Sequence, residues 1–174
     1  MFRWQPLIMR VLHDQIVSWM GLHGLSHWGR VYENGMRLAD ESGANRTVVE
    51  LFAFLHDSQR FEESTDIGHG HRGAEYAKLL RGEYFELTDA EFDLLYIACR
   101  DHTDEVTHED VTIQTCWDSD RLDLGRVGMR PELEYLSTEV ARRQDTIDWA
   151  HSRAVNEIVP EVIAELWYER GGPE

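Results

Sequence analysis

The sequence predicts an all-α fold. Apolar residues recur three and four positions apart along most of the chain, which is the spacing of amphipathic helices, and no stretch alternates long enough to predict a sheet. Helix-start signals precede several of these stretches: Asn45 suits an N-cap, and Thr47 with Glu50 and Thr88 with Glu91 have capping-box spacing. Because no internal repeat or low-complexity tract interrupts the pattern, we expect one domain over residues 1–174.

The expected helices are separated by glycine-containing or polar breaks. In chain order they cover about residues 6–20, 25–42, 46–57, 70–80, 88–102, 113–124 and 141–170. The ring of Pro160 excludes one backbone hydrogen bond, so the last helix should kink there, and Pro131 suits a first helical position. We expect the helices in residues 131–170 to pack on a core that carries the motifs, about residues 23–128.

The stretch from Val48 to Leu55 is apolar at seven of its eight positions. Because it has no one-sided polar face, it is typical of a helix buried on most sides. It runs directly into His56 and Asp57. An unpaired polar group in a dry interior costs about 1–3 kcal/mol, and a bound metal ion would satisfy both side chains.

The composition limits the partners and the cellular setting. Asp and Glu number 33 against 17 Lys and Arg, a net charge of −16, so a nucleic acid polymer would be repelled. No apolar run approaches the ~18 residues of a membrane helix, and residues 1–6 lack the apolar core of a secretion signal. Cys99 and Cys116 are too few for a disulfide framework. We expect an unprocessed cytoplasmic protein; the sequence leaves its oligomeric state open.

Histidine and aspartate residues stand beside the apolar helices. His27 begins one helix, His56 and Asp57 close another, and Asp120 lies within a third. Two imidazoles and two carboxylates suit a divalent first-row metal ion and leave coordination positions for water and a substrate oxygen.

The neighbouring Asp118 cannot face the same way as Asp120, because the two carboxylates lie about 200° apart around a helix. We expect Asp118 to be solvated or paired with Arg121, three residues away.

This arrangement resembles the HD-domain superfamily of metal-dependent phosphohydrolases. The resemblance covers about residues 23–128 and rests on a His-Asp pair after an apolar helix, a histidine upstream of it, and an Asp-Arg-Leu sequence downstream. It implies that His27, His56, Asp57 and Asp120 bind a divalent metal ion and that Asp57 can bridge two ions. The chain lacks the Gly-Tyr-Pro element of the cyclic-dinucleotide-cleaving branch, so that activity does not follow.

Two further stretches extend the resemblance. The sequence His-Gly-His-Arg-Gly-Ala that begins at His69 is similar to a His-Gly-x-x-Gly-Ala motif of the family, and Asp-His-Thr around His102 is similar to a histidine segment after the next apolar helix. The resemblance implies that His69 and His102 bind a second metal ion or contact phosphate. His23, four residues before His27, is a candidate for a position just outside the ligands. His71, two residues after His69, points the other way on a helix, so it should face solvent or lie just outside the ligands.

Phosphate-ester hydrolysis is the activity that the resemblance implies. A divalent ion lowers the pKa of bound water toward neutrality and neutralises a phosphoryl oxygen, and Asp57 would hold that ion. Arg30 and Arg60 each follow a ligand by one turn and could hold a phosphate bidentately, but pairing with Glu33 or Glu63 explains them equally well. We expect a small phosphorylated substrate, such as a nucleotide.

Two other functions fit the same residues. Some helical proteins of HD type hold two irons through a similar set of histidines and aspartates and use dioxygen to cleave carbon bonds. Alternatively, the metal only stabilises the helix packing of a binding or regulatory module, because metal binding is also folding free energy. The ion, one or two per chain, stays open among manganese, cobalt, nickel, iron, zinc and magnesium; imidazole ligands disfavour magnesium at a tight site.

Overall fold

The computed structural model describes residues 3–173. In this part of the chain all regular structure is helical, apart from an isolated bridge between Arg81 and Phe85, so the predicted all-α class is confirmed. The α-helices are α1 (Gln5–Asp14), α2 (Leu25–Ser42), α3 (Arg46–Leu55), α4 (His69–Leu80), α5 (Asp89–Asp101), α6 (Val111–Arg121), α7 (Gln144–Val155) and α8 (Glu161–Glu169), and two 3₁₀ turns are η1 (Leu124–Val127) and η2 (Leu133–Tyr135). The expected domain over residues 1–174 stays a prediction, and residues 1, 2 and 174 lie outside the described part.

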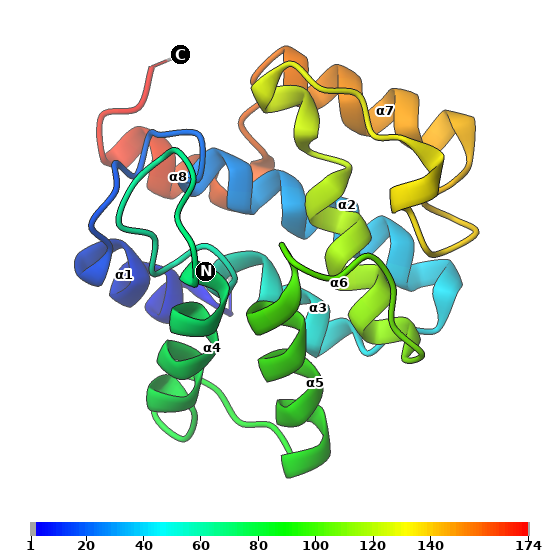
Figure 1. Cartoon of the computed structure of the whole chain (residues 1–174). Helices are drawn as coiled ribbons and strands as arrows, with labels where there is room; N and C mark the ends of the chain where they lie inside the picture. Colours follow the sequence, from blue (N-terminus) through cyan, green and yellow to red (C-terminus); the bar gives the residue numbers. More distant parts are fainter. Residues whose placement is uncertain (1–2, 174) are drawn as a thin grey trace.

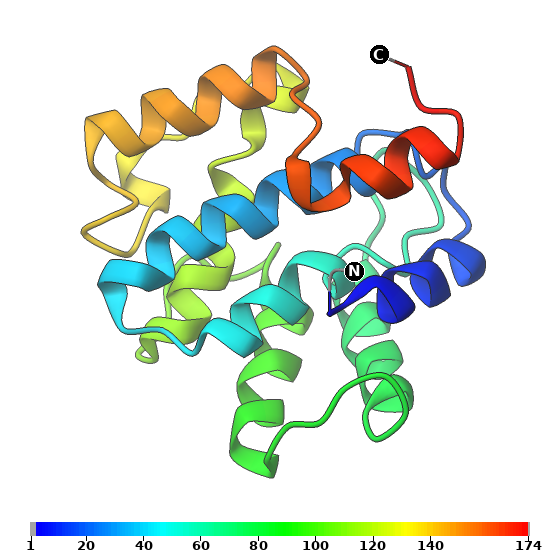
Figure 2. The same cartoon turned by 180° about the vertical axis from the view of Figure 1, so that it is seen from behind.

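Helix α2 is the central element. α3, α6, α7 and α8 all pack against it, and α4 and α5 pack against each other and against α3 (Figures 1 and 2). The α4–α5 pair and the α7 region lie on opposite sides of α2 and α3. No helix in residues 3–173 is both long and apolar enough to cross a bilayer.

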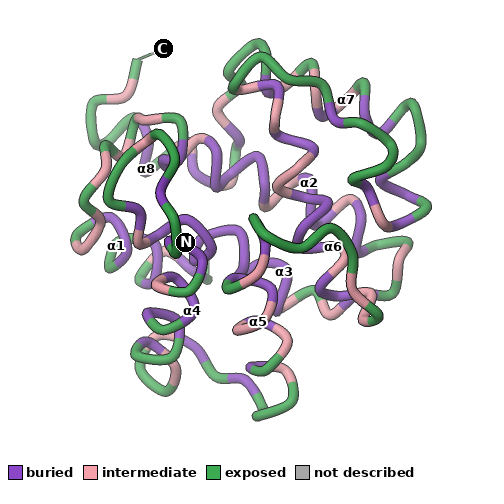
Figure 3. Tube along the Cα trace, in the orientation of Figure 1, coloured by how far each residue is buried: buried purple, intermediate pink, exposed green. Residues whose placement is uncertain are grey.

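Helix α3 forms the middle of the core. Every residue from Val48 to Leu55, including Glu50, is buried (Figure 3), as the apolar pattern at seven of the eight positions predicts. Asn45 caps the helix by accepting hydrogen bonds from the backbone of the residues at positions 47 and 48. The capping box predicted for Thr47 and Glu50 does not form, because the Glu50 carboxylate instead accepts the indole N–H of Trp4 at 3.0 Å.

Gly70 and Gly73, near the start of α4, lie where a larger residue would not fit. A Cβ at Gly70 would lie 2.6 Å from the carbonyl oxygen of Cys99, and one at Gly73 would lie 2.8 Å from the carbonyl oxygens of Leu55 and His56. Helix α4 therefore approaches the ends of α3 and α5 more closely than any larger residue allows. This close approach brings His69, the first residue of α4, to the end of α3.

The first predicted helix is too long. Helix α1 ends at Asp14, and the apolar Ile16 and Met20 that extended the pattern are 67% and 50% exposed. The chain turns instead: the Leu25 N–H donates to the Trp19 carbonyl at 2.8 Å, which folds the segment back into α2. At α5 the prediction is confirmed, because the Thr88–Glu91 capping box is present.

The predicted continuous helix over residues 141–170 is also wrong. It is two helices, α7 and α8, and Pro160 is the N-cap residue of α8 rather than the site of a kink. The proline ring cannot follow a helical residue easily, and the break also contains Glu157 at a positive φ of 51°. Pro131 does not begin a helix; it precedes the short turn η2.

Replacement of Gly73 by alanine should lower the free energy of unfolding by about 1–2 kcal/mol. Overpacking against backbone carbonyls typically costs about 1–3 kcal/mol, and the gain of up to about 1 kcal/mol in helix propensity offsets part of it. Urea denaturation monitored by circular dichroism measures the change. Lys78→Ala, at an exposed position of the same helix, is the matched control and should change stability by less than about 0.5 kcal/mol. Equal stability of Gly73→Ala and the wild type would contradict the packing described.

Candidate metal centre

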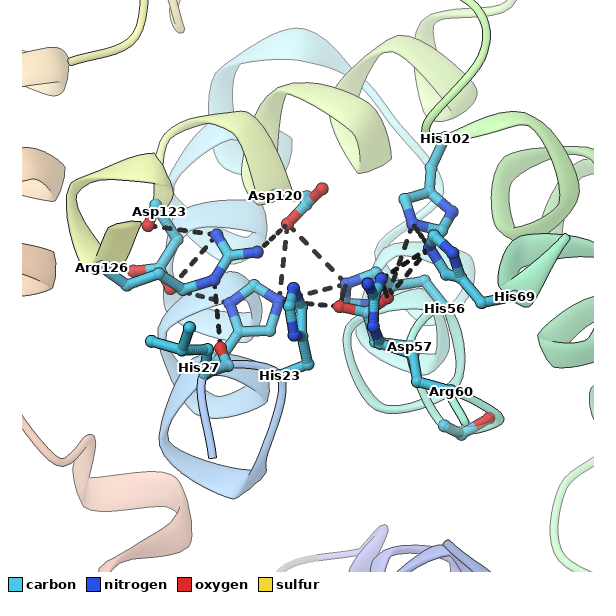
Figure 4. Close-up of polar contacts among 12 residues, drawn as sticks. His23, His27, His56, Asp57, Arg60, His69, His102, Asp120, Asp123 and Arg126 are labelled. Atoms are coloured by element: carbon cyan, nitrogen blue, oxygen red, sulfur yellow. Dashed lines mark hydrogen bonds and ion pairs between the residues drawn. The ribbon is translucent and has the colours of Figure 1, made fainter. Parts of the chain in front are cut away.

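Six histidine and aspartate side chains come together where helix ends meet (Figure 4). They are His27 of α2, His56 and Asp57 directly after α3, His69 at the start of α4, His102 directly after α5, and Asp120 near the end of α6. The first five side chains are at most 6% exposed, whereas that of Asp120 is 17% exposed. The cluster is therefore enclosed by protein, and Asp120 is its most exposed member.

Four donor atoms form a first group, subsite A: Nε2 of His27, Nε2 of His56, Oδ2 of Asp57 and Oδ1 of Asp120. The two Nε2 atoms lie 3.2 Å apart. Asp57 Oδ2 lies 3.5 and 3.4 Å from them, and Asp120 Oδ1 lies 3.5 and 3.8 Å from them. Donors that bind one ion at about 2.1 Å are about 3.0–3.4 Å apart in octahedral or tetrahedral geometry. The separations of 3.2–3.8 Å lie at or slightly above this range, so His27, His56 and Asp57 can hold one first-row ion, with Asp120 facing them.

Three donor atoms form a second group, subsite B: Oδ1 of Asp57, Nε2 of His69 and Nε2 of His102. The two nitrogens lie 3.0 Å apart, and the carboxylate oxygen lies 3.2 Å from His69 Nε2 and 3.7 Å from His102 Nε2. The two oxygens of Asp57 thus face different subsites (Figure 4). This is the geometry of a carboxylate that can bridge two ions.

The hydrogen bonds at the other ring nitrogen define the state of each histidine. His27 Nδ1 lies 2.7 Å from Oδ2 of Asp123, and the Nδ1 atoms of His56, His69 and His102 lie 3.0, 2.6 and 2.8 Å from the backbone carbonyl oxygens of Phe52, Asp66 and Cys99. Carboxylate and carbonyl oxygens only accept, so each Nδ1 carries a proton and each Nε2 of a neutral ring carries a lone pair.

In subsite A two such lone pairs face each other across 3.2 Å, where a proton would satisfy one nitrogen and a metal ion binds both. In subsite B the two Nε2 atoms lie 3.0 Å apart, and that of His69 also accepts an N–H of Arg60 at 3.0 Å. Asp120 Oδ1, which faces subsite A, is buried and has no hydrogen-bond partner. An imidazole that donates through Nδ1 and coordinates through Nε2 is the usual form of a metal-binding histidine. The residues therefore fit a metal ion.

The carboxylates of the cluster are held in the ionised form that metal binding requires. Burial acts to raise the pKa of Asp57 and Asp120, but the charged groups around them outweigh it. The pKa of Asp57 lies well below its usual value beside His56, and the pKa of Asp120 is lowered beside Arg126. Arg126 Nη2 lies 3.7 Å from Asp120 Oδ1.

Arg30 lies outside the cluster. Its guanidinium donates to Asp123 at 2.7 and 3.2 Å and to the Ile158 carbonyl at 3.2 Å, and the residue is buried. The same Asp123 accepts from His27, so Arg30 orients a ligand through that carboxylate. Because these contacts occupy the guanidinium, the expectation that Arg30 holds a phosphate is not carried forward.

Arg60 does face the cluster. Its Nη1 donates to Asp57 Oδ1 at 3.2 Å and lies 3.0 Å from His69 Nε2. Its Nη2 donates to the Ser64 carbonyl at 2.7 Å, which fixes the guanidinium beside subsite B. The alternative pairing with Glu63 is not present among the described contacts of Arg60.

His23 lies beside the cluster and His71 does not. The His23 ring centroid is 6.2 Å from that of His27, and its Nδ1 lies 2.7 Å from Oε2 of Glu63. Burial lowers the pKa of His23 to about 4, although Asp57 and Glu63 act in the opposite direction. His71 is exposed on α4, which agrees with the solvent-facing position and not with one just outside the ligands.

Asp118 is neither solvated nor paired mainly with Arg121, contrary to expectation. It is fully buried, and its carboxylate accepts the backbone N–H of Ser137 at 2.9 Å and the N–H and hydroxyl of Thr138 at 2.7 and 2.8 Å. Burial raises its pKa despite these hydrogen bonds. Asp118 therefore anchors the segment after η2 to α6, while Asp120 on the same helix faces the cluster.

Two functional neighbours escape sequence reasoning. Asp123 orients His27, and Glu63 holds His23. Asp123 stands in the Asp-Arg-Leu-Asp sequence, three residues after Asp120, and this one-turn spacing is the only signal that could have indicated it. Glu63 lies in a loop, where no periodicity specifies the direction of a side chain.

Comparison with known proteins agrees with this geometry. The chain is similar to the crystal structure of a predicted HD superfamily hydrolase from an uncultured Thermotogales bacterium, with a TM-score of 0.64, 27% sequence identity, and coverage of 96% of this chain and 93% of that chain. No family model matches the chain, and no curated protein matches it. The resemblance to the HD-domain superfamily is therefore confirmed in the fold, and the site adds buried histidine and aspartate residues able to hold a metal ion.

Addition of Mn²⁺, Ni²⁺ or Zn²⁺ to chelator-treated protein should raise its melting temperature. An ion present at 100 times its Kd stabilises the fold by about 2.7 kcal/mol, which corresponds to about 5–10 °C in a chain of this size. Differential scanning calorimetry with and without ion measures the shift. Asp57→Asn should abolish most of it, whereas Asp93→Asn, at an exposed carboxylate on α5, should retain it. An equal shift in Asp57→Asn would contradict the assignment.

The loop before His69 should show an acid-dependent contribution to stability. Burial acts to raise the pKa of Asp66, but the Phe61 N–H and Arg72, at 2.6 and 2.6–2.7 Å, lower it below its usual value. A lowered carboxyl pKa stabilises the fold above the unfolded-state pKa of about 3.9, and this stabilisation is lost as the pH falls through the folded-state pKa.

Asp66→Asn should therefore destabilise the protein by about 1.5–3 kcal/mol at pH 7, the usual contribution of hydrogen bonds to a charged group, and by progressively less below about pH 4. Urea denaturation of both proteins between pH 3 and 7 measures the difference. A difference that grows on acidification would contradict this account.

Proposed function

We propose that the protein is a metal-dependent hydrolase that acts on phosphate esters of small molecules. The observation that supports this best is the pair of subsites joined by Asp57, because two neighbouring ions can stabilise both the attacking and the leaving oxygen of a phosphoryl displacement. The likeness to a predicted HD superfamily hydrolase supports the hydrolase class. The substrate and the identity of the ions belong to the proposal.

When bound, divalent ions at the subsites would lower the pKa of water and neutralise phosphoryl oxygens. The chain would contribute the fixed positions of the donor atoms and two cations near them. Arg60 Nη1 lies beside Asp57, and Arg126 Nη2 lies beside Asp120 (Figure 4). Arg126 Nη2 is the better placed to hold a phosphoryl oxygen by charge-assisted hydrogen bonds, because Arg60 already donates to Glu62, Asp57 and Ser64.

His23 is the candidate for orienting the attacking water. Its pKa of about 4 leaves the ring neutral at neutral pH and makes it too weak a base to take a proton efficiently. The Glu63 carboxylate at its Nδ1 fixes the tautomer that offers Nε2 as a hydrogen-bond acceptor. The remaining donors of the site stay deprotonated as ligands.

An oxygenase that uses two irons is the second candidate. Subsite B offers two imidazoles and one carboxylate, a set that also suits iron in oxygen-activating sites, and the bridging position of Asp57 serves either chemistry. Iron content, colour and dioxygen uptake distinguish this candidate from the hydrolase. A large loss of stability on chelation without turnover of any kind would instead favour the module in which the metal only stabilises helix packing.

Asp57→Asn should lower metal-dependent phosphate release at least 100-fold. Loss of a group just outside the metal ligands typically costs 10–100-fold in activity, and Asp57 contacts both subsites. A phosphate-release assay over a panel of phosphate esters with Mn²⁺, Co²⁺, Ni²⁺ or Zn²⁺ measures the rates. Asp93→Asn is the matched control and should keep the wild-type rate. An undiminished rate in Asp57→Asn would overturn the proposed function.

A further inference from the structure

A cavity of about 600 Å³ lies beside the metal cluster. Two of the segments that line it begin one residue after a residue of the cluster: Thr103 follows His102, and Arg121 follows Asp120. The Thr103 hydroxyl lies 3.3 Å from Nε2 of His69. Thr103 thus belongs both to the cavity lining and to the surroundings of subsite B, so the cavity adjoins the cluster there.

The wall of the cavity is mainly apolar. It is formed by Val106, Leu124, Met129, Pro131, Tyr135 and Leu136. Three of these side chains remain largely exposed: Val106 at 45%, Met129 at 52% and Tyr135 at 48%. Neighbouring exposed apolar side chains around a cavity are typical of a binding site, and the volume lies in the usual range of about 300–1,000 Å³ for small-molecule sites.

The charged residues of the cavity disfavour an anionic occupant. Asp104, Glu105 and Glu132 bring three carboxylates to its lining. Two arginines line the cavity. Arg130 pairs with Asp148, which lies outside the cavity, and the guanidinium of the other arginine donates its hydrogen bonds to backbone carbonyls.

That arginine, Arg121, donates to the carbonyl oxygens of Val106 at 2.6 Å and Tyr135 at 2.8 Å, and also to that of Glu105. It therefore ties together the two segments that form the cavity wall instead of offering a free cation. A second phosphate group in the cavity would meet three carboxylates and no unengaged arginine of its lining.

We propose that this cavity holds the organic part of the substrate, and that this part is an uncharged, apolar group of the size of a ring. This proposal rests on the proposed hydrolysis of phosphate esters. The preferred substrate is then a monophosphate ester of an apolar alcohol. Sugar phosphates are disfavoured, because a polar sugar gains little from an apolar wall. Molecules with further phosphate groups are disfavoured, because the carboxylates of the cavity repel them.

Turnover of two esters by the manganese-loaded protein tests this assignment. We expect kcat/KM for 2-naphthyl phosphate to exceed that for glycerol phosphate at least tenfold. Val106→Asp and Met129→Asp should each raise KM for 2-naphthyl phosphate about tenfold and leave kcat/KM for glycerol phosphate within twofold. Leu79→Asp, at a position on α4 that is 76% exposed, is the matched control and should change neither. Equal use of both esters, or an unchanged preference in both variants, would overturn the proposal.

Binding of the alcohol alone separates this proposal from the proposed function. Isothermal titration calorimetry with 2-naphthol should give binding to the wild type and to Leu79→Asp, and about tenfold weaker binding to Met129→Asp. If no phosphate ester is hydrolysed but 2-naphthol binds in this pattern, the hydrolase proposal fails and the cavity assignment stands. If 2-naphthol does not bind the wild type, the cavity assignment fails whatever the activity.

Discussion

Four imidazole nitrogens with lone pairs converge with carboxylate oxygens in the interior. These buried atoms need partners, and the packing of the helix ends around them depends on that need. Each histidine is fixed in one tautomer because its Nδ1 donates to an oxygen that can only accept. Three of these acceptors are backbone carbonyls three or four residues earlier, so the local chain geometry at a helix end both places the ring and sets its protonation. The fourth is Asp123, itself held by Arg30.

The fold supplies this convergence by directing helix ends to one place. The apolar helix α3 crosses the core and delivers His56 and Asp57 at its end, where they are enclosed. Gly73 lets α4 contact that end directly, which brings His69 to the other oxygen of Asp57. Burial of these side chains strengthens their electrostatic interactions with an ion. Thr103, which lines the cavity, contacts His69, so the cavity adjoins subsite B.

Sequence patterns predict the parts of this structure that depend on local spacing. The buried run of α3, the Asn45 cap and the α5 capping box follow from periodicity and hydrogen-bonding chemistry, and the histidines and aspartates of the cluster follow from their positions at helix ends. Contacts between distant segments do not. Arg30 has the spacing of a residue facing the site, yet it binds Asp123 on another element. Ile16 and Met20 continue a helical pattern but find no surface to pack against, so α1 ends before them.

Anomalous scattering from crystals soaked with Mn²⁺ or Zn²⁺ tests the central claim most directly, because it locates ions independently of any reaction. The account predicts one ion among His27, His56, Asp57 and Asp120, and places any second ion at the other oxygen of Asp57 with His69 and His102. Every imidazole should coordinate through Nε2. The account would be contradicted if ions bound only elsewhere on the acidic surface. In that case the facing Nε2 atoms would still lie within about 3.2 Å of each other, with no ion between them.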